Sequence, residues 1–292
     1  MTELLWDCRC TVGESPIWDP VRRRVWFTDI PAGRLHAWSV DSAARTVWDL
    51  RDGAAPATLA SIGLCRSGRL VLALRDRVVL FHPGSGEMQD LTASFGLPAR
   101  VRLNDGKVGP DGAFWVGSMD MGEPVDHPEQ LPLGTLFRVA PDGTVTRAVE
   151  EVTISNGLAW SPDGRTMYYA DTQGVWIDAI AFDPATGALG ERRRLVAPDE
   201  GAGRADGGAT DSEGGYWSAG VAGGVLNRWS ADGGLLARLP MPVSSPTALC
   251  FTENGQACLT SLRPAGDTVT ASGGLFRLNL GVAGSPVGLF DA

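Results

Sequence analysis

SNGLAWSPDGRTMYYADTQGVWIDAIAF (155–182) contains three short runs of apolar, aromatic and β-branched residues, separated by turn-forming residues. Runs of this length and composition are typical of β-strands. The turn Ser-Pro-Asp-Gly (161–164) has the Asp-Gly chemistry that tight hairpins favour. The segment therefore predicts three antiparallel strands in succession.

The middle run of this segment recurs six times along the chain. The starts of the six copies are 42 to 53 residues apart, and such an interval is close to one four-stranded propeller blade. The copies are VWFTD (25–29), LVLAL (70–74), FWVGS (114–118), MYYAD (167–171), GYWSA (215–219) and ACLTS (257–261). We therefore expect an all-β fold, a six-bladed β-propeller with four-stranded antiparallel blades around a central channel, as one domain over residues 1–292.

A third strand and a turn recur in the same phase. The third strands read GRLHAWSV (33–40), DRVVLFHP (76–83), GTLFRVAP (134–141), GVWIDAIAF (174–182), GGVLNRWS (223–230) and GGLFRLNL (273–280). The turns before the second strands read GPDG (109–112), SPDG (161–164), DSEG (211–214) and TENG (252–255). We expect residues 3–10 to pair with the last blade near SPVGLFDA (285–292) and so to close the ring.

Composition and charge exclude several classes of protein. Of 292 residues, 43% are hydrophobic and 20% charged, which is enough to build a core and argues against disorder. The net charge of −9 argues against a nucleic-acid partner, and the absence of 18 consecutive apolar residues argues against a membrane span. The N-terminal stretch lacks signal-peptide features, and five cysteines without CxxC spacing indicate free thiols. We expect a cytoplasmic protein, and a monomer because a closed ring leaves no free sheet edge.

Four oxygen-bearing side chains stand where inner strands are expected to begin. They are Glu14, Asn104, Asn156 and Asp206, and successive members are separated by 90, 52 and 50 residues, or one to two repeats. The spacing places them at equivalent positions around the channel. Carboxylate and amide oxygens suit hard cations. The sequence predicts one divalent cation in the channel, with Ca²⁺ favoured and Mg²⁺, Mn²⁺, Zn²⁺ or Fe²⁺ as alternatives.

A simpler interpretation exists for each of these residues alone. Asp-Gly and Asn-Gly are ordinary turn dipeptides, and Glu14, taken alone, is equally consistent with an ordinary surface residue. Four donors in register favour a metal site over four unrelated turns. The histidines at 36, 82 and 127 fall on third strands or in a loop, which argues against a histidine-based catalytic zinc site.

At these residues the chain resembles the SMP-30/gluconolactonase/luciferin-regenerating-enzyme family of sugar lactonases. The matching motifs are GESPIW (13–18), RLNDGK (102–107), PDGAFWVGSM (110–119), SNGLAWSPDG (155–164) and ADGGATDSEGGYW (205–217). The resemblance implies that Glu14, Asn156 and Asp206 ligate the metal, and that Asp206 is the general base. It also implies that Arg102 and Asn104 face the substrate, with Asn104 close to or touching the metal.

The chain departs from the family pattern in two places. Ala205 precedes Asp206 where proline is common, and the stretch Asp120–Glu123 replaces an acidic stretch that reaches the substrate. Glu123 is our candidate for the acidic substrate contact, and which residue of 119–133 makes that contact is left open. We expect the loops 119–133 and 262–272 to form walls of the site. We expect Asp29 and Asp171 to support it rather than to bind metal.

The resemblance implies metal-dependent hydrolysis of a small sugar (aldono-) lactone to the aldonic acid. In that reaction a divalent ion polarises the carbonyl, Asp206 accepts a proton from the attacking water and Arg102 stabilises negative charge. Arg102 has an alternative role as an ion-pair partner of Asp105. Two other functions remain open: hydrolysis of another ester or phosphoester on the same scaffold, and a non-catalytic propeller that serves as an interaction module.

Overall fold

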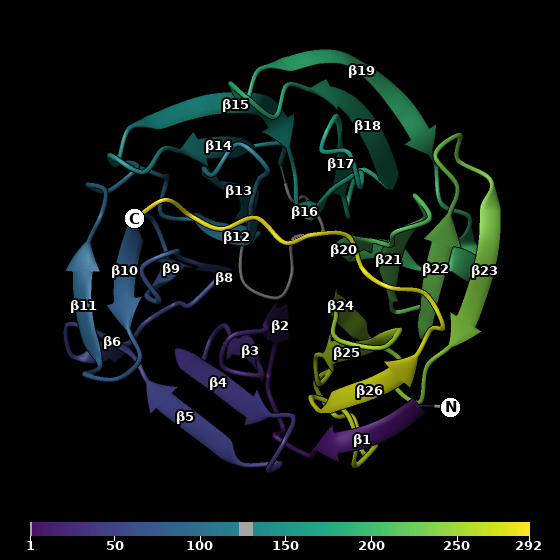
Figure 1. The fold of residues 1–292 in the computed structure, drawn as a ribbon, viewed down its shortest axis with the longest axis horizontal. Coiled ribbons are helices and arrows are strands. Elements are labelled where there is room, and N and C mark those ends of the chain that lie inside the picture. The colour runs from purple at the N-terminus through teal and green to yellow at the C-terminus, as the bar shows by residue number, and fades with distance from the viewer. Residues whose placement is uncertain (1, 123–130) are drawn as a thin grey trace.

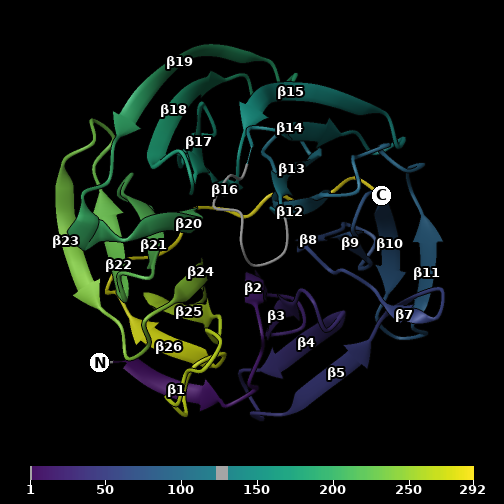
Figure 2. The same cartoon turned by 180° about the vertical axis from the view of Figure 1, so that it is seen from behind.

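Six small sheets stand around one axis and leave a channel between their innermost strands (Figure 1). The computed structural model describes residues 2–122 and 131–292. Each of the six sheets has four antiparallel strands, so the predicted all-β, six-bladed propeller is confirmed. Figure 2 shows the same ring from the other side. The strand next to the axis is called the inner strand of its blade.

The first three blades follow one another along the chain, each from the axis outward. Blade 1 contains β2 (Gly13–Asp19), β3 (Arg24–Asp29), β4 (Arg34–Ser39) and β5 (Arg45–Asp49). Blade 2 contains β8 (Ser61–Leu64), β9 (Leu70–Ala73), β10 (Val78–His82) and β11 (Glu87–Asp90). Blade 3 contains β12 (Val101–Val108), β13 (Phe114–Asp120), β14 (Gly134–Val139) and β15 (Val145–Val152). A two-stranded ribbon between blades 1 and 2 contains β6 (Arg51–Asp52) and β7 (Ala55–Pro56).

The other three blades complete the ring. Blade 4 contains β16 (Ser155–Trp160), β17 (Thr166–Asp171), β18 (Trp176–Phe182) and β19 (Leu189–Val196). Blade 5 contains β20 (Arg204–Thr210), β21 (Tyr216–Val221), β22 (Val225–Trp229) and β23 (Leu235–Pro240). Blade 6 contains β24 (Pro246–Phe251), β25 (Gln256–Ser261), β26 (Leu275–Asn279) and β1 (Thr2–Trp6). The 3₁₀ segment η1 (Glu200–Ala202) precedes β20.

Both faces of each blade are buried against its neighbours. In the described residues, a cluster of apolar side chains fills each of the six interfaces between adjacent blades. Alternate residues of a strand point to opposite faces of its sheet, so a strand buried on both faces is apolar throughout. This explains why second strands such as β3 and β17 read as continuous apolar runs that end in an aspartate.

The turns between inner and second strands are fixed by an aspartate and a tryptophan. The indole N–H of Trp26 donates to Asp19, that of Trp115 to Asp111 and that of Trp217 to Asp211, at 3.2, 3.1 and 2.7 Å. Gly112 and Gly164 end two of these turns with φ of 73° and 70°, a conformation that glycine adopts without a steric penalty. The predicted hairpins are therefore confirmed.

The first strand closes the ring, although not with the partner that we expected. Strand β1 pairs with β26, with Thr2 opposite Leu278 and Leu4 opposite Phe276. The prediction that residues 3–10 pair near 285–292 is wrong. β26 is the third strand of its blade and still needs an outer neighbour, and β1 fills that place.

The C-terminal segment crosses one end of the channel instead. It leaves blade 6, passes the central opening and ends beside blade 2 (Figure 1). Ser285 N–H donates to Thr210 O at 2.9 Å, and Phe290 N–H donates to Leu64 O at 2.8 Å. We call this end, where the inner strands finish, the far mouth, and the end where they begin the entry mouth. The loop 262–272 starts at the entry mouth, because Arg263 N–H donates to Thr11 O at 3.1 Å beside the start of β2.

Candidate functional site

Five of the six inner strands contain a one-residue β-bulge. In blade 1, Glu14 lies opposite Thr28 while Ile17 lies opposite Trp26, so three steps on one strand face two on the other. A bulge bends a strand and re-aims the side chains next to it. The inner strand of blade 2, β8, pairs without a register shift. The bulges span Glu14–Ile17, Leu103–Gly106, Asn156–Ala159, Ala205–Gly208 and Pro246–Leu249.

The four predicted donors all lie at these bulges and at equivalent positions. Gly13 and Trp18 pair with Asp29 and Val25 on either side of Glu14, so five steps on the inner strand face four on the second strand. The same five steps face four around Asn104, Asn156 and Asp206.

Glu14 and Asn156 are the last paired residues before a bulge, and the next residues, Ser15 and Gly157, have φ of 51° and 73°. Asn104 and Asp206 lie just inside their bulges, because in blades 3 and 5 the unpaired interval begins one residue earlier relative to the donor. The expected equivalence of the four donors is therefore confirmed, and only the start of the bulge differs. The bulges of blades 1 and 4 contain a left-handed residue after the donor, and those of blades 3 and 5 do not. All four side chains are buried, with 3–8% of their surface exposed.

The two asparagines contact each other and form part of a hydrogen-bond chain across three blades. Asn104 Nδ2 donates to Asn156 Oδ1 at 3.1 Å and to Ser155 O at 2.9 Å. Asn156 Nδ2 donates to Thr172 Oγ1 at 2.7 Å, and that hydroxyl donates to Ala205 O at 2.6 Å. Because the threonine hydroxyl is a donor to the carbonyl, it accepts from the amide nitrogen. This fixes the orientation of the Asn156 amide and directs its oxygen toward Asn104.

Glu14 and Asp206 form a buried, hydrogen-bonded pair of carboxyl groups. Burial and the nearby Asp105 raise the pKa of Glu14 to about 8. Burial, followed by repulsion from Glu14 and Asp105, raises the pKa of Asp206 well above its ordinary value. Buried carboxyl groups that share a site resist simultaneous ionisation. Without a compensating cation, the pair therefore retains a proton at neutral pH.

Arg102 lies within the electrostatic reach of this pair. Its Nη1 donates to Asn104 Oδ1 and to Leu103 O, both at 2.8 Å. Burial lowers the pKa of Arg102 to about 10, while Glu14 and Asp206 act in the opposite direction. No ion pair joins Arg102 to Asp105, two residues that the structure describes. Asp105 instead accepts from the backbone N–H of Leu158 at 3.0 Å, so the ion-pair alternative for Arg102 is not observed.

The donor set fits a hard divalent cation. It offers two carboxylates and two amide oxygens from blades 1, 3, 4 and 5, on both sides of the channel (Figure 1). Oxygen donors of these kinds suit Ca²⁺ and Mg²⁺. Two positive charges would also balance Glu14 and Asp206 once both are ionised. No group of three or more His, Cys, Asp or Glu residues suited to a metal occurs among residues 2–122 and 131–292, so amide oxygens are needed to complete such a site.

Two aspartates at the ends of second strands support the site, as expected. Asp29 accepts from the backbone N–H groups of Thr11 and Val12, both at 3.1 Å, just before Glu14. Asp171 accepts from those of Thr153 and Ile154 at 2.8 and 3.0 Å, just before Asn156. Each carboxylate therefore holds the start of an inner strand and is engaged by backbone rather than turned toward the channel.

Sequence reasoning missed several residues that hold the bulges in place. Ser15 Oγ accepts from Ile62 N–H at 3.0 Å and joins blades 1 and 2. Thr247, in the blade 6 bulge, donates to Gly13 O at 2.5 Å and joins blades 6 and 1. Thr172 links the Asn156 amide to the strand of Asp206. The only signal available in the sequence was their place next to a motif, since hydroxyl residues are common at strand ends.

Other predicted residues lie elsewhere. Glu123 and His127 fall outside the described residues. His36 is buried on β4 and stacks on Phe27, with ring centroids 4.7 Å apart, and His82 is exposed on β10. The five cysteines are free thiols, as predicted. Helices long and apolar enough to cross a bilayer do not occur in the described part of the chain.

A cavity of about 490 Å³ lies at the far mouth, away from the four donors. Its walls include Pro110, Trp160 and Phe251, together with the C-terminal segment 285–289. A much smaller hollow of about 10 Å³, which is lined by Ser15, Asp105, Lys107 and Gly207 among others, lies deeper in the channel. Glu14, Asn104, Asn156 and Asp206 do not line the far cavity, so it is separate from the candidate site.

Comparison with known proteins identifies relatives along nearly the whole chain. The model of the SMP-30/gluconolactonase/LRE-like region matches residues 12–263. A pentonolactonase of Haloferax volcanii is 31% identical, over 96% of this chain and 94% of its own. A regucalcin of Xenopus laevis is 32% identical, over 94% of this chain and 92% of its own.

Solved structures have the same architecture. A calcium-binding protein, regucalcin, from Agrobacterium tumefaciens matches with a TM-score of 0.90 at 26% identity, over 100% of this chain and 98% of its own. A gluconolactonase of Xanthomonas campestris matches with a TM-score of 0.76 at 26% identity, over 96% of this chain and 89% of its own.

Proposed function

The chain belongs to the SMP-30/gluconolactonase/LRE-like family, and on that premise we propose that it hydrolyses a sugar lactone at the entry mouth with the help of one divalent cation. The observation that carries the proposal is the convergence of two amide side chains, Asn104 and Asn156, with the buried carboxyl pair of Glu14 and Asp206 at the start of four inner strands. The names of the similar pentonolactonase and gluconolactonase support an aldonolactone as the substrate.

Glu14, Asn156 and Asp206 hold the cation in this proposal, and Asn104 lies beside it or touches it. When bound, the cation polarises a carbonyl group and lowers the pKa of a water molecule. Ca²⁺ is our first choice, which the calcium-binding protein among the similar structures supports. Mg²⁺, Mn²⁺, Zn²⁺ and Fe²⁺ remain alternatives, since oxygen sites discriminate by geometry and availability.

Asp206 acts as the general base. As a carboxylate beside the cation, it is placed to accept the proton that the attacking water loses.

Arg102 and Asn104 bind and orient the lactone. The Arg102 guanidinium presents several donors to ring hydroxyls and to the negative charge that develops on the carbonyl oxygen. Its bond to Asn104 Oδ1 at 2.8 Å holds both groups toward the same part of the channel. A contact between Glu123 and the substrate stays a prediction, as do a monomeric state and a cytoplasmic location.

The test is acid release from a panel of aldonolactones, measured with a pH indicator on protein stripped of metal and resupplied with each of the five cations. We expect one or more lactones to turn over only with added metal. Asp206→Asn retains an oxygen donor but no base, and we expect it to lower turnover by a factor of about 10² to 10⁴. Asp163→Asn, in an exposed turn at the far mouth, is the matched control and should leave turnover unchanged.

Two results would redirect the assignment. Turnover of simple esters or phosphoesters without any lactone would favour the alternative hydrolase. Folded protein that accepts no substrate with any cation would leave only the interaction module.

A further inference from the structure

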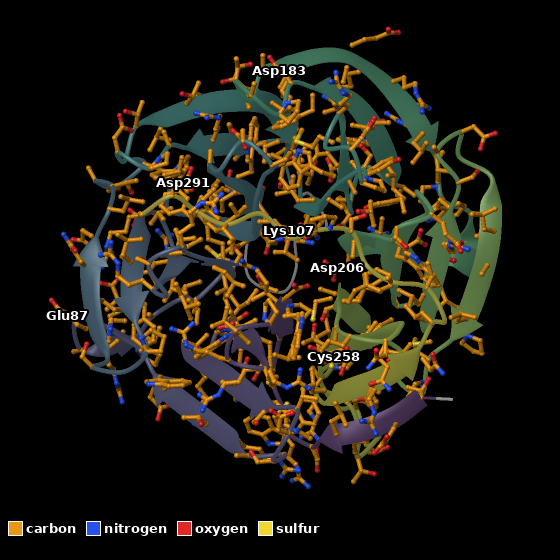
Figure 3. All side chains as sticks on the ribbon, in the orientation of Figure 1. Glu87, Lys107, Asp183, Asp206, Cys258 and Asp291 are labelled. Carbon is orange, nitrogen blue, oxygen red and sulfur yellow. The ribbon has the colours of Figure 1, made fainter. Side chains whose placement is uncertain are left out.

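Lys107 is the only lysine among the 292 residues, in a chain that uses arginine at its 24 other Lys/Arg positions. It lies on β12, three residues beyond Asn104, and Figure 3 shows it close to Asp206 beside the channel. An ammonium group is a compact point charge, whereas a guanidinium is a broad planar fork. A lysine can therefore occupy a narrower space than an arginine.

The ammonium group of Lys107 reaches across the inside of blade 4. Its Nζ donates to the carbonyl oxygen of Gly208 on β20 at 2.6 Å, which joins residues 101 positions apart. Gly208 closes the bulge that contains Asp206, because Ala205 and Gly208 are the paired residues on either side of it. The contact therefore fastens the backbone beside the proposed base to the strand that carries Arg102 and Asn104.

Asp105 completes this fastening from the same bulge of β12. It accepts from Leu158 N–H on β16 at 3.0 Å, just beyond Asn156. Burial lowers the pKa of Lys107, and the opposite charge of Asp105 counteracts part of that effect. The two side chains together connect β12 with β16 and β20, the strands that carry Asn104, Asn156 and Asp206.

Packing leaves little freedom at the other end of the contact. A Cβ atom on Gly207 would lie 2.3 Å from Ala248 Cβ, and one on Gly208 would lie 2.6 Å from Tyr216 Oη. Tyr216 Oη itself donates to Gly157 O at 2.9 Å. Lys107 also lines both the hollow of about 10 Å³ and the far cavity, so it lies where the two border each other.

We infer that Lys107 is a positioning residue of the proposed metal and lactone site, in which its ammonium group fixes the Asp206 bulge of β20 against β12. The structural part of this inference rests on the contact between Lys107 and Gly208. Its effect on cation binding rests on the proposed function. The inference requires that the loss of the ammonium group weakens cation binding. Removal of a positive charge near a cation site would by Coulomb's law alone strengthen binding, so the direction of the change separates the two effects.

The experiment titrates CaCl₂ and MnCl₂ into metal-stripped protein by calorimetry. We expect Lys107→Met to raise the Kd by about tenfold or more, which is the usual effect of losing a residue that supports a ligand. Arg66→Met is the matched control. Arg66 lines the far cavity and pairs with Asp291, so this substitution removes a positive charge without changing a contact of β20. The Kd of Arg66→Met should stay within about twofold of that of the parent protein. Unchanged or tighter binding in Lys107→Met would overturn the inference.

Hydrogen exchange of residues 204–210, in the absence of metal, gives a second and independent readout. We expect exchange about tenfold faster in Lys107→Met than in the parent protein or Arg66→Met, because an anchor of β20 is lost. Equal exchange rates would overturn the inference even if the cation data agreed. Should the parent protein bind no cation at all, the proposed function fails, and exchange alone decides the role of Lys107. Should Lys107→Met fail to fold, Lys107→Gln, which keeps a donor without the charge, is measured in its place.

Discussion

The inner strands of blades 2 and 4 both pair antiparallel with the second strand of their blade, but only the inner strand of blade 4 contains a β-bulge. Strand β8 of blade 2 pairs with β9 in unbroken register from Ser61 to Leu64. Strand β16 of blade 4 has a bulge after Asn156, with Gly157 at a φ of 73°. Both strands are fully buried and both pack against two neighbouring blades. Ring formation therefore does not need the bulge, whereas the placement of polar side chains at the channel does.

The largest expected effect comes from a substitution of Gly157, in the bulge of β16. A Cβ there would lie 2.6 Å from Tyr216 Oη and 2.8 Å from Ala170 Cβ, at a backbone angle that disfavours alanine. We expect Gly157→Ala to lower the free energy of unfolding by about 2–5 kcal/mol, the sum of an overpacking cost and a backbone cost. Thermal or urea unfolding measures this.

Gly53→Ala isolates the backbone part of that effect. Gly53 has a φ of 64°, and no atom lies within 4 Å of the place that a Cβ would take, so only the conformational penalty of about 1–2 kcal/mol remains. Equal losses in the two variants would show that the Gly157 bulge is not sterically fixed.

A smaller effect is expected from Thr172→Val, which leaves the bulge intact and removes its side-chain link. The change breaks the bond from Asn156 Nδ2 and the bond to Ala205 O. We expect cation affinity to fall about tenfold, because the Asn156 amide loses the contact that orients it.

Ser61→Ala is the matched control on the regular strand of blade 2. Its hydroxyl is buried and has no hydrogen-bond partner among the residues that the structure describes, so its loss breaks no hydrogen bond there. Calorimetric titration should give an unchanged Kd for Ser61→Ala. A fall in affinity equal to that of Thr172→Val would mean that the site depends on channel packing in general.

The smallest expected effect is a dependence of stability on pH in the metal-free protein. The pKa of Glu14 is raised from 4.5 to about 8, so the folded state keeps a proton that the unfolded state has lost. Stability therefore falls as pH rises through this range. The buried His36, whose pKa is lowered from 6.5 to about 4, gives the opposite slope below pH 6.5. The useful window is thus pH 6.5 to 8, where we expect a loss of about 1–2 kcal/mol.

Urea unfolding at several pH values with a chelator, and again with saturating CaCl₂, measures this slope. The cation should flatten it, because it favours the ionised carboxylates in the folded state. A slope that is the same with and without the cation would contradict the assignment of Glu14 and Asp206 as ligands.

The sequence alone determined the fold and its repeat. Residues buried on both faces of a blade must be apolar in every copy, and the turns between strands favour Asp-Gly and related dipeptides. The apolar runs and the turns therefore recur at regular intervals along the chain. The sequence also placed Glu14, Asn104, Asn156 and Asp206 near the start of the inner strands, where the structure brings them together. These features depend on neighbours along the chain, and local pattern is enough to reveal them.

Only the tertiary structure decided the partner of β1, the places of the five bulges and the role of Lys107. Spacing along the chain counts residues, but a bulge adds a residue without changing the place of the strand, so spacing cannot locate it. The Lys107–Gly208 contact joins blades 3 and 5 across a gap of 101 residues. It depends on how wide the channel is at that level, a distance that is fixed only when six blades have packed around one axis.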